Sequence, residues 1–497
     1  MNLSADKCAS PAKWDNWNSI QWNKVTRGVK SLQSRIVKAV KAKHFHKARA
    51  LVFLLARSFY GKLLAIFRVT TNKGSKTCGV DKVLWNTKAK KWKGLEQLTI
   101  RGYKAQALKR KSIPKKNGKY RHLGIPTIRD RAMQALFKLG LDAIAETTAD
   151  PNSYGFRAKR SCADAIEQCH NALCKRNSSQ WILEADITGC FDNIAHPWIL
   201  EHIPINKKVL SQWLKSGYID KKTWFPTEAG TPQGGIISPT IANMVLDGLE
   251  ALIQRTVCGN RYRNGLYSNP HKVHYVRYAD DFIVTCNNRE YLENEIKPII
   301  CGFLAERGLE LSKEKTNVTH IQDGFDFLGF NVRKYKHKCL TKPKKDSIKG
   351  IYASMKECVS QNKAVTQRRL IELLRPKIVG WANFYRHSAS KRIFSLMDSK
   401  LFTLLWRWAC RRHPNKGKYW IKDKYFHSKG NRHWAFMTQD KHSPVILPRF
   451  DATRIIRHTK IKSEANPYDK EWAKYFEKRD KKHIGIQNKM DILAYAN

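Results

Sequence analysis

The chain has 497 residues, of which 42% are hydrophobic and 11% aromatic, so it can bury sizeable cores and is not a disordered polymer; the length suggests about three domains. Its 93 Lys and Arg residues against 41 Asp and Glu give a net charge of +52, which indicates a large polyanion as partner. The longest apolar stretch is interrupted by Arg57 and Lys62, and the first residues contain no signal-peptide core. We therefore expect neither membrane insertion nor export, and predict a cytoplasmic, intracellular protein.

The cysteines give no sign of a zinc site. Twelve cysteines are scattered along the chain, and no two of them have the C-x2-C spacing that a zinc ribbon or finger requires. In a reducing compartment such residues are expected to be core residues and spare thiols.

The first 110 residues read as a basic helical extension. Helical spacing between about 20 and 70 places Val25, Val29, Leu32, Ile36 and Val40 on one face. The rest of that helix is basic, which leaves a side free for phosphates, and the residues predicted to contact phosphates there are Lys24, Arg27, Lys30, Arg35 and Lys38.

From 111 to 335 short strands alternate with helices, and this mixed block contains the candidate chemistry. In WILEADITGCFDNI an apolar run ends at Asp186, and Gly189 then allows a tight turn. Asp192 lies past the turn, where a helix start or a structural role is the better interpretation than a metal ligand.

The segment EAGTPQGGIISPT follows in the same block. Gly230, Gly234 and Gly235 let the backbone approach a ligand closely, and an amphipathic helix is expected from about Ser238. Such a junction suits a base or a sugar-phosphate edge, although a plain loop remains the alternative.

The segment VHYVRYADDFIVTC sets Asp280 and Asp281 side by side between two short apolar runs. Neighbouring side chains on a regular strand point to opposite faces, so the two carboxylates can share a site only at a bend, which predicts a hairpin tip. Two carboxylates this close repel each other unless a cation lies between them, and Mg²⁺ prefers such hard oxygen ligands. A solvated Asp-Asp turn is the other interpretation of these residues alone.

A lysine-rich stretch, KYKHKCLTKPKK at 334–345, is predicted to be a linker on a phosphate backbone. The phosphate contacts expected from it are Lys334, Lys336, Lys338, Lys344 and Lys345. Helical periodicity returns after it, up to about 430, and the final segment from 431 is basic with interspersed aromatic residues.

Taken together and in this order, the Asp186 segment, TPQGG and Tyr-Ala-Asp-Asp resemble reverse transcriptases. The wider chain resembles the group II intron reverse transcriptase/maturase family, because of SKTCGVD, IPKKNGKYRHLGIPTIRDRAMQ, SYGFRAKRS, GLELSKEKT, FDFLGF, LRPKIVGWANFYR and WRWACRRHPNK. These matches span nearly the whole chain, from about residue 20 to 480, and their combination is far more specific than any one of them.

The resemblance implies an α+β, right-hand polymerase with an antiparallel palm sheet. It implies fingers and palm at 111–335, an α-helical thumb with the maturase domain at 336–430, and a DNA-binding segment at 431–497. Asp186, Asp280 and Asp281 would be catalytic carboxylates that hold two Mg²⁺ ions, with the Ile187 carbonyl as a further ligand.

For the incoming dNTP, the resemblance implies that Phe191 packs under the sugar and excludes a 2′-hydroxyl, and that Gln233 lines the nucleotide. Lys115 and Arg121 match residues that grip the triphosphate; both reach it only if the loop between their strands is longer than a two-residue turn at Asn117-Gly118, or carries a bulge. Lys315 is a candidate for a role near the pyrophosphate, and a solvated surface lysine is the alternative. FDFLGF resembles the primer grip but is also compatible with core.

The expected partners are the intron RNA, which Arg375 and Arg386 would also contact, the target DNA or primer strand, and dNTPs, with no membrane. The chain shows no endonuclease module, so second-strand nicking is not expected. Two functions remain: an RNA-directed DNA polymerase that also assists splicing and intron mobility by target-primed reverse transcription, or an RNA-binding maturase without polymerase activity. The intact carboxylates with Phe191 and Gln233 favour the first, and LRPKIVGWANFYR disfavours a retron-like enzyme.

Overall fold

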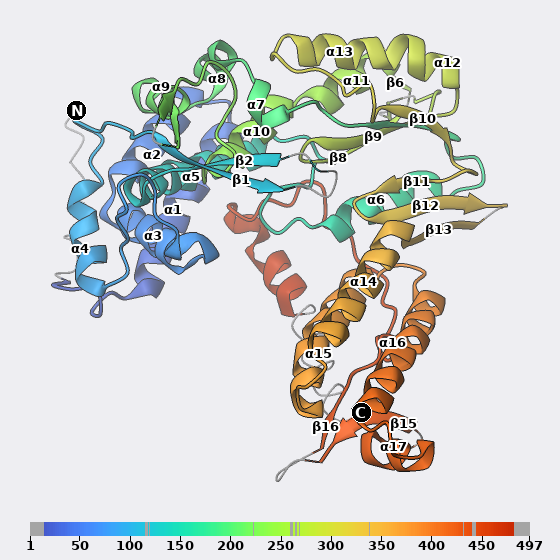
Figure 1. The fold of residues 1–497 in the computed structure, drawn as a ribbon. Helices are drawn as coiled ribbons and strands as arrows, with labels where there is room; N and C mark the ends of the chain where they lie inside the picture. Colours follow the sequence, from blue (N-terminus) through green and yellow to red (C-terminus); the bar gives the residue numbers. More distant parts are fainter. Residues whose placement is uncertain are drawn as a thin grey trace, which may run out of the picture.

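The computed structural model describes residues 14–114, 118, 120–221, 223–258, 262–263, 266–267, 269–336, 338–430, 432–439 and 444–481. Its elements form three regions: an N-terminal group of helices with a small sheet, a central sheet flanked by helices, and a column of long helices that extends away from both (Figure 1). Within these ranges no single helix is long and apolar enough to cross a membrane, and one pair passes that test only when its two members, bent by 68°, are taken together: α2 (Phe45–Arg57) and α3 (Phe59–Thr71).

The N-terminal region packs α1 (Trp22–Lys41), α2 and α3 around the central helix α5 (Ile128–Thr148). α1 buries the apolar face that its periodicity predicts, although Leu32 is only half-buried. α5 is buried on most of its surface because other helices cover it, and the Thr127 hydroxyl caps its first turn by accepting from the Asp130 N–H.

A small sheet lies beside these helices in the order β2-β1-β4-β5. β1 pairs antiparallel with β2 and parallel with β4. Because only Leu108 and Lys109 of β1 pair with β4, the rest of the hairpin β1–β2 extends beyond the other two strands. The strands, and three further helices of this part of the molecule, are β1 (Leu108–Pro114), β2 (Tyr120–Ile125), β4 (Tyr218–Asp220), β5 (Thr223–Phe225), α4 (Lys88–Gln97), α8 (His196–His202) and α9 (Lys207–Leu214).

The central sheet is antiparallel, with strand order β10-β3-β9-β8, as expected for a palm. Its side chains alternate between two cores: Leu183 and Val284 belong to the core shared with the N-terminal helices, whereas Ile182 and Ile283 face a second core shared with the long helices. The helices α11 and α13 lie on one side and α6 on the other (Figure 1). The bounds are β3 (Trp181–Ala185), β8 (His274–Tyr278), β9 (Asp281–Cys286), β10 (Asn317–His320), α6 (Cys162–Leu173), α10 (Ser238–Leu246), α11 (Leu249–Cys258) and α13 (Lys297–Ala305).

The prediction of a linker at 334–345 is wrong. These residues instead form most of a second hairpin. β12 (Phe330–Tyr335) pairs antiparallel with β13 (Lys338–Pro343), so the hairpin spans the expected boundary at 335. The stretch is rich in lysine, yet β13 alternates, with Cys339 and Thr341 buried between accessible residues. β11 (Phe325–Phe327) completes a three-stranded sheet that joins the palm to the long helices.

The long helices are α14 (Lys345–Gln361), α15 (Gln367–Tyr385) and α16 (Lys391–Arg412). They pack through a continuous apolar interior that includes Met355, Leu374 and Phe394. At their far end lie α17 (Lys418–Tyr425) and a small sheet of β14 (Phe426–Lys429), β15 (Arg432–Thr438) and β16 (Val445–Ile446).

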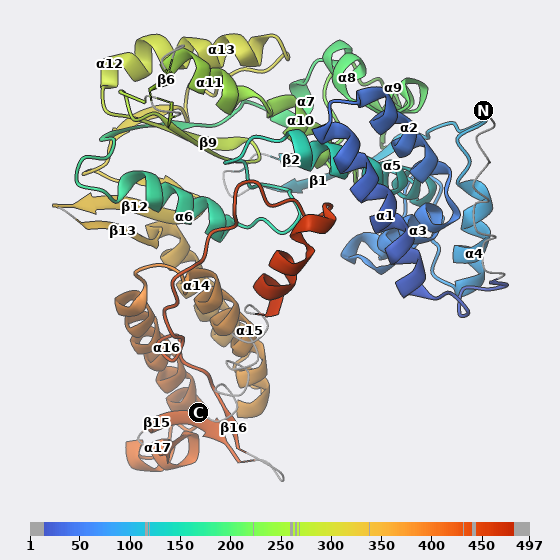
Figure 2. The same cartoon turned by 180° about the vertical axis from the view of Figure 1, so that it is seen from behind.

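The chain after β16 returns along the long helices toward the N-terminal region (Figure 2). Ion pairs and hydrogen bonds hold this returning segment: the Lys41 ammonium lies 2.6 Å from Asp469, and His458 Nε2 lies 2.9 Å from the buried carboxylate of Asp164 in α6. Residues 447–481, which belong to the segment that was expected to bind DNA, therefore form a strap that connects the helical column to the other two regions.

Candidate active site

The two adjacent aspartates lie at a hairpin tip, as the sequence predicts. Tyr278 pairs with Asp281 across β8 and β9, so Ala279 and Asp280 form the turn between them. Ala279 has a φ of 59°, and this bend brings two neighbouring carboxylates to the same end of the sheet. The two strands form here because the runs on either side of the turn are rich in apolar β-branched and aromatic residues, which favour strands.

A buried arginine supports the turn from below. Arg277 is fully buried, and its guanidinium contacts the Asp247 carboxylate, donates to Asn243 Oδ1 at 3.2 Å and reaches the Ala279 carbonyl at 3.4 Å. This residue is not among those predicted from the sequence, although a lone arginine inside an apolar strand is a visible signal. Its donors hold the turn because a buried guanidinium must find acceptors.

The segment before α6 covers the same turn. The Arg277 carbonyl accepts from the Tyr154 N–H at 2.9 Å, and the Gly155 carbonyl accepts from Asn243 Nδ2 at 2.7 Å. A Cβ on Gly155 would lie only 2.3 Å from the Ala279 nitrogen, so any larger residue there would displace the hairpin turn.

Asp186 follows β3, the neighbour of β9. Ala185 in β3 pairs antiparallel with Phe282 in β9. Asp186, which follows Ala185, therefore lies next to Asp281, which precedes Phe282. A short bridge between Ile187 and Leu311 fixes the chain beyond it, through the bonds Ser312 N–H to Asp186 O and Thr188 N–H to Glu310 O. Ile187 uses neither its N–H nor its carbonyl in that bridge, which suits its expected use as a backbone ligand.

The three carboxylates share one electrostatic environment. Partial desolvation, the charge of Asp280 and a hydrogen bond with Asp186 raise the pKa of Asp281 to about 7, and desolvation with the Asp186 charge also raises the pKa of Asp280. The ammonium of Lys315 contacts the Asp186 carboxylate, and this hydrogen bond raises the pKa of Lys315. Lys315 therefore supplies positive charge where three negative charges converge.

The donor set fits a hard divalent cation in its chemistry. Within the ranges that the structure describes, no three or more His, Cys, Asp or Glu side chains have the arrangement of a metal-ion site. Burial, and after it the neighbouring negative charges, nevertheless raise the pKa of Asp280 and of Asp281, and carboxylate oxygens are the ligands Mg²⁺ prefers. Asp186, Asp280, Asp281 and the Ile187 carbonyl are thus compatible with Mg²⁺.

The segments that carry Phe191 and Gln233 contact each other through backbone and side-chain hydrogen bonds. Phe191 lies in the short helix α7 (Cys190–Asn193), where its carbonyl accepts from the Thr231 N–H at 2.6 Å. Gly230, with a φ of 81°, permits this contact, since a Cβ there would lie 2.5 Å from the Phe191 carbonyl oxygen. Gln233 Nε2 donates to Asp192 at 3.2 Å, which agrees with a structural role for Asp192.

The β1–β2 hairpin brings Arg121 toward this site. Pro114 pairs with Tyr120, so five residues connect the two strands and the loop is longer than two residues, as the geometry required. Arg121 is exposed, and its charge lowers the pKa of Asp280 against the larger opposing effect of desolvation. Lys115 lies in the connection, outside the described residues.

FDFLGF packs mainly as core. Phe325, Phe327 and Phe330 are buried, and Leu328 with Gly329 forms a two-residue turn between β11 and β12. The Gly329 carbonyl accepts from the Tyr385 hydroxyl at 3.0 Å, which attaches this turn to α15.

The residues expected to bind RNA separate into surface and buried groups. The five residues of α1 that were predicted to contact RNA are exposed, as are Lys336, Lys338 and Lys345. Lys344 is half-buried, 3.4 Å from Asp326, and Arg375 donates to the Ile446 carbonyl at 2.9 Å. The prediction that Lys334 and Arg386 contact RNA is corrected, because both residues are buried. Lys334 points inward on β12 by strand alternation, and its ammonium donates to the Lys175 carbonyl at 2.6 Å and to Ser178 at 3.0 Å.

The structure has the right-hand architecture of nucleic-acid polymerases. It combines an N-terminal region of helices and a small sheet, an antiparallel sheet that presents carboxylates at a hairpin tip, and a column of helices beyond that sheet. Three family models match the chain: the N-terminal domain of reverse transcriptase at residues 17–98, reverse transcriptase (RNA-dependent DNA polymerase) at 113–332, and the group II intron maturase-specific domain at 348–426.

Individual relatives agree with these models. Protein YkfC of Escherichia coli K12 is 30% identical over 301 residues, which cover 53% of this chain and 78% of YkfC. Group II intron-encoded protein LtrA of Lactococcus lactis subsp. cremoris is 29% identical over 342 residues, which cover 56% of each chain. The chain belongs to the group II intron reverse transcriptase and maturase family, and it spans little more than half the length of LtrA.

A solved telomerase from Candida albicans, in complex with a fragment of telomeric RNA, matches 64% of each chain at 12% identity, with a TM-score of 0.36.

Proposed function

We propose that this protein is an RNA-directed DNA polymerase that also binds its group II intron RNA, acting inside the cell as a ribonucleoprotein that assists splicing and target-primed reverse transcription. The observation that carries the proposal is the convergence of Asp186, Asp280 and Asp281 at the end of the palm sheet. An RNA-binding chaperone has no need of such a carboxylate group.

In this proposal the three carboxylates and the Ile187 carbonyl hold two Mg²⁺ ions, which supply activation of the primer hydroxyl and stabilisation of the leaving oxygen. Arg121, with Lys115, binds the triphosphate, and Gln233 lines the nucleotide. Phe191 excludes a 2′-hydroxyl. Lys315 neutralises or protonates the pyrophosphate, because its ammonium already lies at the carboxylates.

For the RNA, the exposed basic face of α1 and the exposed lysines of the β12–β13 hairpin form a candidate contact surface for phosphates. The second candidate function, a maturase without polymerase activity, is supported by the match of residues 348–426 to the maturase-specific domain, which accounts for RNA binding alone.

The deciding experiment is primer extension on an RNA template with Mg²⁺ and dNTPs, with RNA binding measured in parallel. Wild-type protein should make cDNA, and the variant Asp280→Ala/Asp281→Ala should make none while still binding RNA, because the net charge changes little. The control Asp423→Ala removes an exposed carboxylate from α17 and should leave synthesis unchanged. RNA binding without cDNA synthesis by the wild type would establish the maturase-only alternative, and near-normal synthesis by the double variant would refute the metal assignment.

A further inference from the structure

Phe156 has a strained backbone beside the candidate active site. Its φ is 57°, an unfavourable conformation for a bulky residue, and the residue is 54% exposed, so core packing does not account for the strain. Its ring meets the ring of Phe191 edge-on, with centroids 6.3 Å apart and planes at 78°. This is a preferred geometry for an aromatic pair.

The residues before Phe156 are fixed to the catalytic hairpin. The Tyr154 N–H donates to the Arg277 carbonyl at 2.9 Å, and Gly155 packs directly on the Ala279 backbone. The position of Phe156 is therefore tied to the turn that carries Asp280.

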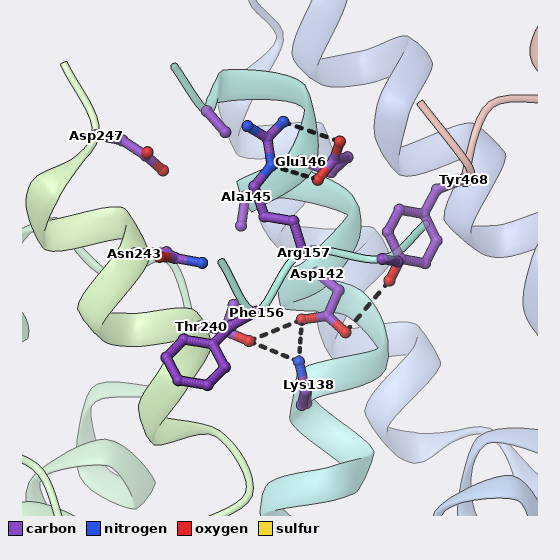
Figure 3. A pocket seen from close by; sticks show the side chains of 12 residues that line it. Lys138, Asp142, Ala145, Glu146, Phe156, Arg157, Thr240, Asn243, Asp247 and Tyr468 are labelled. Carbon is purple, nitrogen blue, oxygen red and sulfur yellow. Dashed lines mark hydrogen bonds and ion pairs between the residues drawn. The ribbon is translucent and has the colours of Figure 1, made fainter. Parts of the chain in front are cut away.

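The residue after Phe156 is anchored to α5. Arg157 donates from Nε to one Glu146 oxygen at 2.8 Å and from Nη2 to the other at 2.9 Å (Figure 3). Its Nη1 donates to the Asp150 and Ser153 carbonyls at 2.7 Å each. With both neighbours held, the chain at Phe156 has little freedom to relax, and the strain persists because the surroundings determine it.

Phe156 also lies at the edge of a cavity of about 180 Å³ between α5, α10 and the returning strap (Figure 3). Lys138, Asp142 and Thr240 form a hydrogen-bonded group in its wall, which the Tyr468 hydroxyl joins at 3.3 Å from Asp142. A polar wall is a poor partner for an aromatic ring, so the ring of Phe191 is the more favourable neighbour for Phe156.

We propose that Phe156 is a positioning residue for sugar selection: its ring edge holds the ring of Phe191 at the place where that ring meets the 2′ position of the incoming nucleotide. The inference rests on the proposed function, in which Phe191 contacts the sugar. Discrimination against ribonucleotides then depends on the aromatic pair and not on Phe191 alone, and the strain at Phe156 is the conformational cost of that arrangement.

The test is single-nucleotide incorporation of dATP and ATP on an RNA template, with kcat and KM measured separately. Phe156→Ala should lower the preference for dATP by about 2- to 12-fold, the effect of removing one aromatic pair, mainly through a lower KM for ATP. Phe156→Tyr keeps the ring and should keep the preference. Phe45→Ala removes a phenylalanine of similar exposure, 52%, from α2 and should change nothing.

A double-mutant cycle with Phe191→Ala shows whether Phe156 acts through Phe191. In the Phe191→Ala background, Phe156→Ala should have no further effect on the preference. An equal effect in both backgrounds, or none in the single variant, would overturn the inference. If Phe156→Ala is unstable, Phe156→Leu keeps the bulk without the aromatic edge and answers the same question. A wild-type protein that incorporates neither nucleotide would instead refute the proposed function.

Discussion

The Lys315 ammonium lies against the Asp186 carboxylate, although 129 positions separate the two residues in the sequence. The loop after α13 brings them together, because the bond from the Ser312 N–H to the Asp186 carbonyl aligns the two segments at 2.8 Å. Lys315 is thus a neighbour of the carboxylates, while 66% of its side chain remains exposed to solvent.

Replacing Lys315 tests its part in the chemistry. Lys315→Ala should slow single-turnover dNTP incorporation by about 10²- to 10⁴-fold if the lysine acts as general acid to the leaving pyrophosphate. Lys315→Arg keeps the positive charge but transfers a proton poorly. Compared with Lys315→Ala, it should therefore restore dNTP binding more than the rate of incorporation. Lys313→Ala, two residues earlier and exposed, is the matched control and should behave as wild type. Equal rates for Lys315→Ala and wild type would exclude a catalytic role.

The raised pKa of Asp281 predicts that the effect of Mg²⁺ on thermal stability depends on pH. Its pKa is raised to about 7, above the unfolded value near 3.8, so the folded protein retains a proton there that the unfolded chain has released. In metal-free protein this contribution to stability is present at low pH and is lost as the pH rises toward 7 and above. Mg²⁺ competes with that proton, so it should raise Tm more at pH 8 than at pH 6. Thermal unfolding with and without Mg²⁺ measures this, and Asp281→Asn should remove the difference.

Asp164 should be a critical anchor of the strap. Its carboxylate is fully buried and accepts from the Ile461 N–H at 2.7 Å and from Arg479 at 2.8 Å, in addition to His458 and Ser161. Burial opposes its ionisation, but the bonds from His458 and Ser161 hold the pKa of Asp164 well below its usual range. Its stabilising contribution is therefore present at neutral pH and lost only in strong acid.

Asp164→Ala should lower the free energy of unfolding by about 3–5 kcal/mol, because it leaves buried donors without their charged acceptor. Urea unfolding measures this decrease, with Glu167→Gln on the same helix as control. A change below about 1 kcal/mol would mean that other interactions hold the strap in place.

Salt dependence distinguishes specific from general RNA binding. Replacing Lys24, Arg27, Lys30 and Lys38 with Ala should reduce the slope of log affinity against log salt by about 0.7 to 0.9 for each phosphate that the protein no longer neutralises. Lys334→Met should leave the slope unchanged and lower stability instead, since that ammonium is buried and hydrogen-bonded within the protein.

The companion measurement compares the cognate intron RNA with an unrelated structured RNA of equal length at about 0.1 and 0.5 M salt, where the screening length shortens from roughly 10 Å to about 4 Å. The unrelated RNA should dissociate first, because its binding rests on charge, whereas the intron is also recognised by shape and stacking. Parallel dissociation of both RNAs would contradict the maturase half of the proposal.

Local sequence determined the features that depend on nearest neighbours. The apolar runs around Asp280 and Asp281 predicted a hairpin because two adjacent carboxylates can share a site only at a bend, and the structure confirms it. The 3.6-residue spacing of valines and isoleucines likewise predicted the buried face of α1.

Tertiary structure alone decided which charged residues reach solvent and which are enclosed. Lys334 stands in sequence as one lysine among several, and Arg277 as a lone arginine between apolar residues. In the structure both side chains are buried and donate to carbonyl or carboxylate acceptors. The pairing of Phe156 with Phe191, the contact of Lys315 with Asp186 and the return of the strap to Asp164 are equally absent from any local pattern. The reason is physical: periodicity reports how a segment divides its own surface, whereas burial of a polar group depends on partners that distant segments supply.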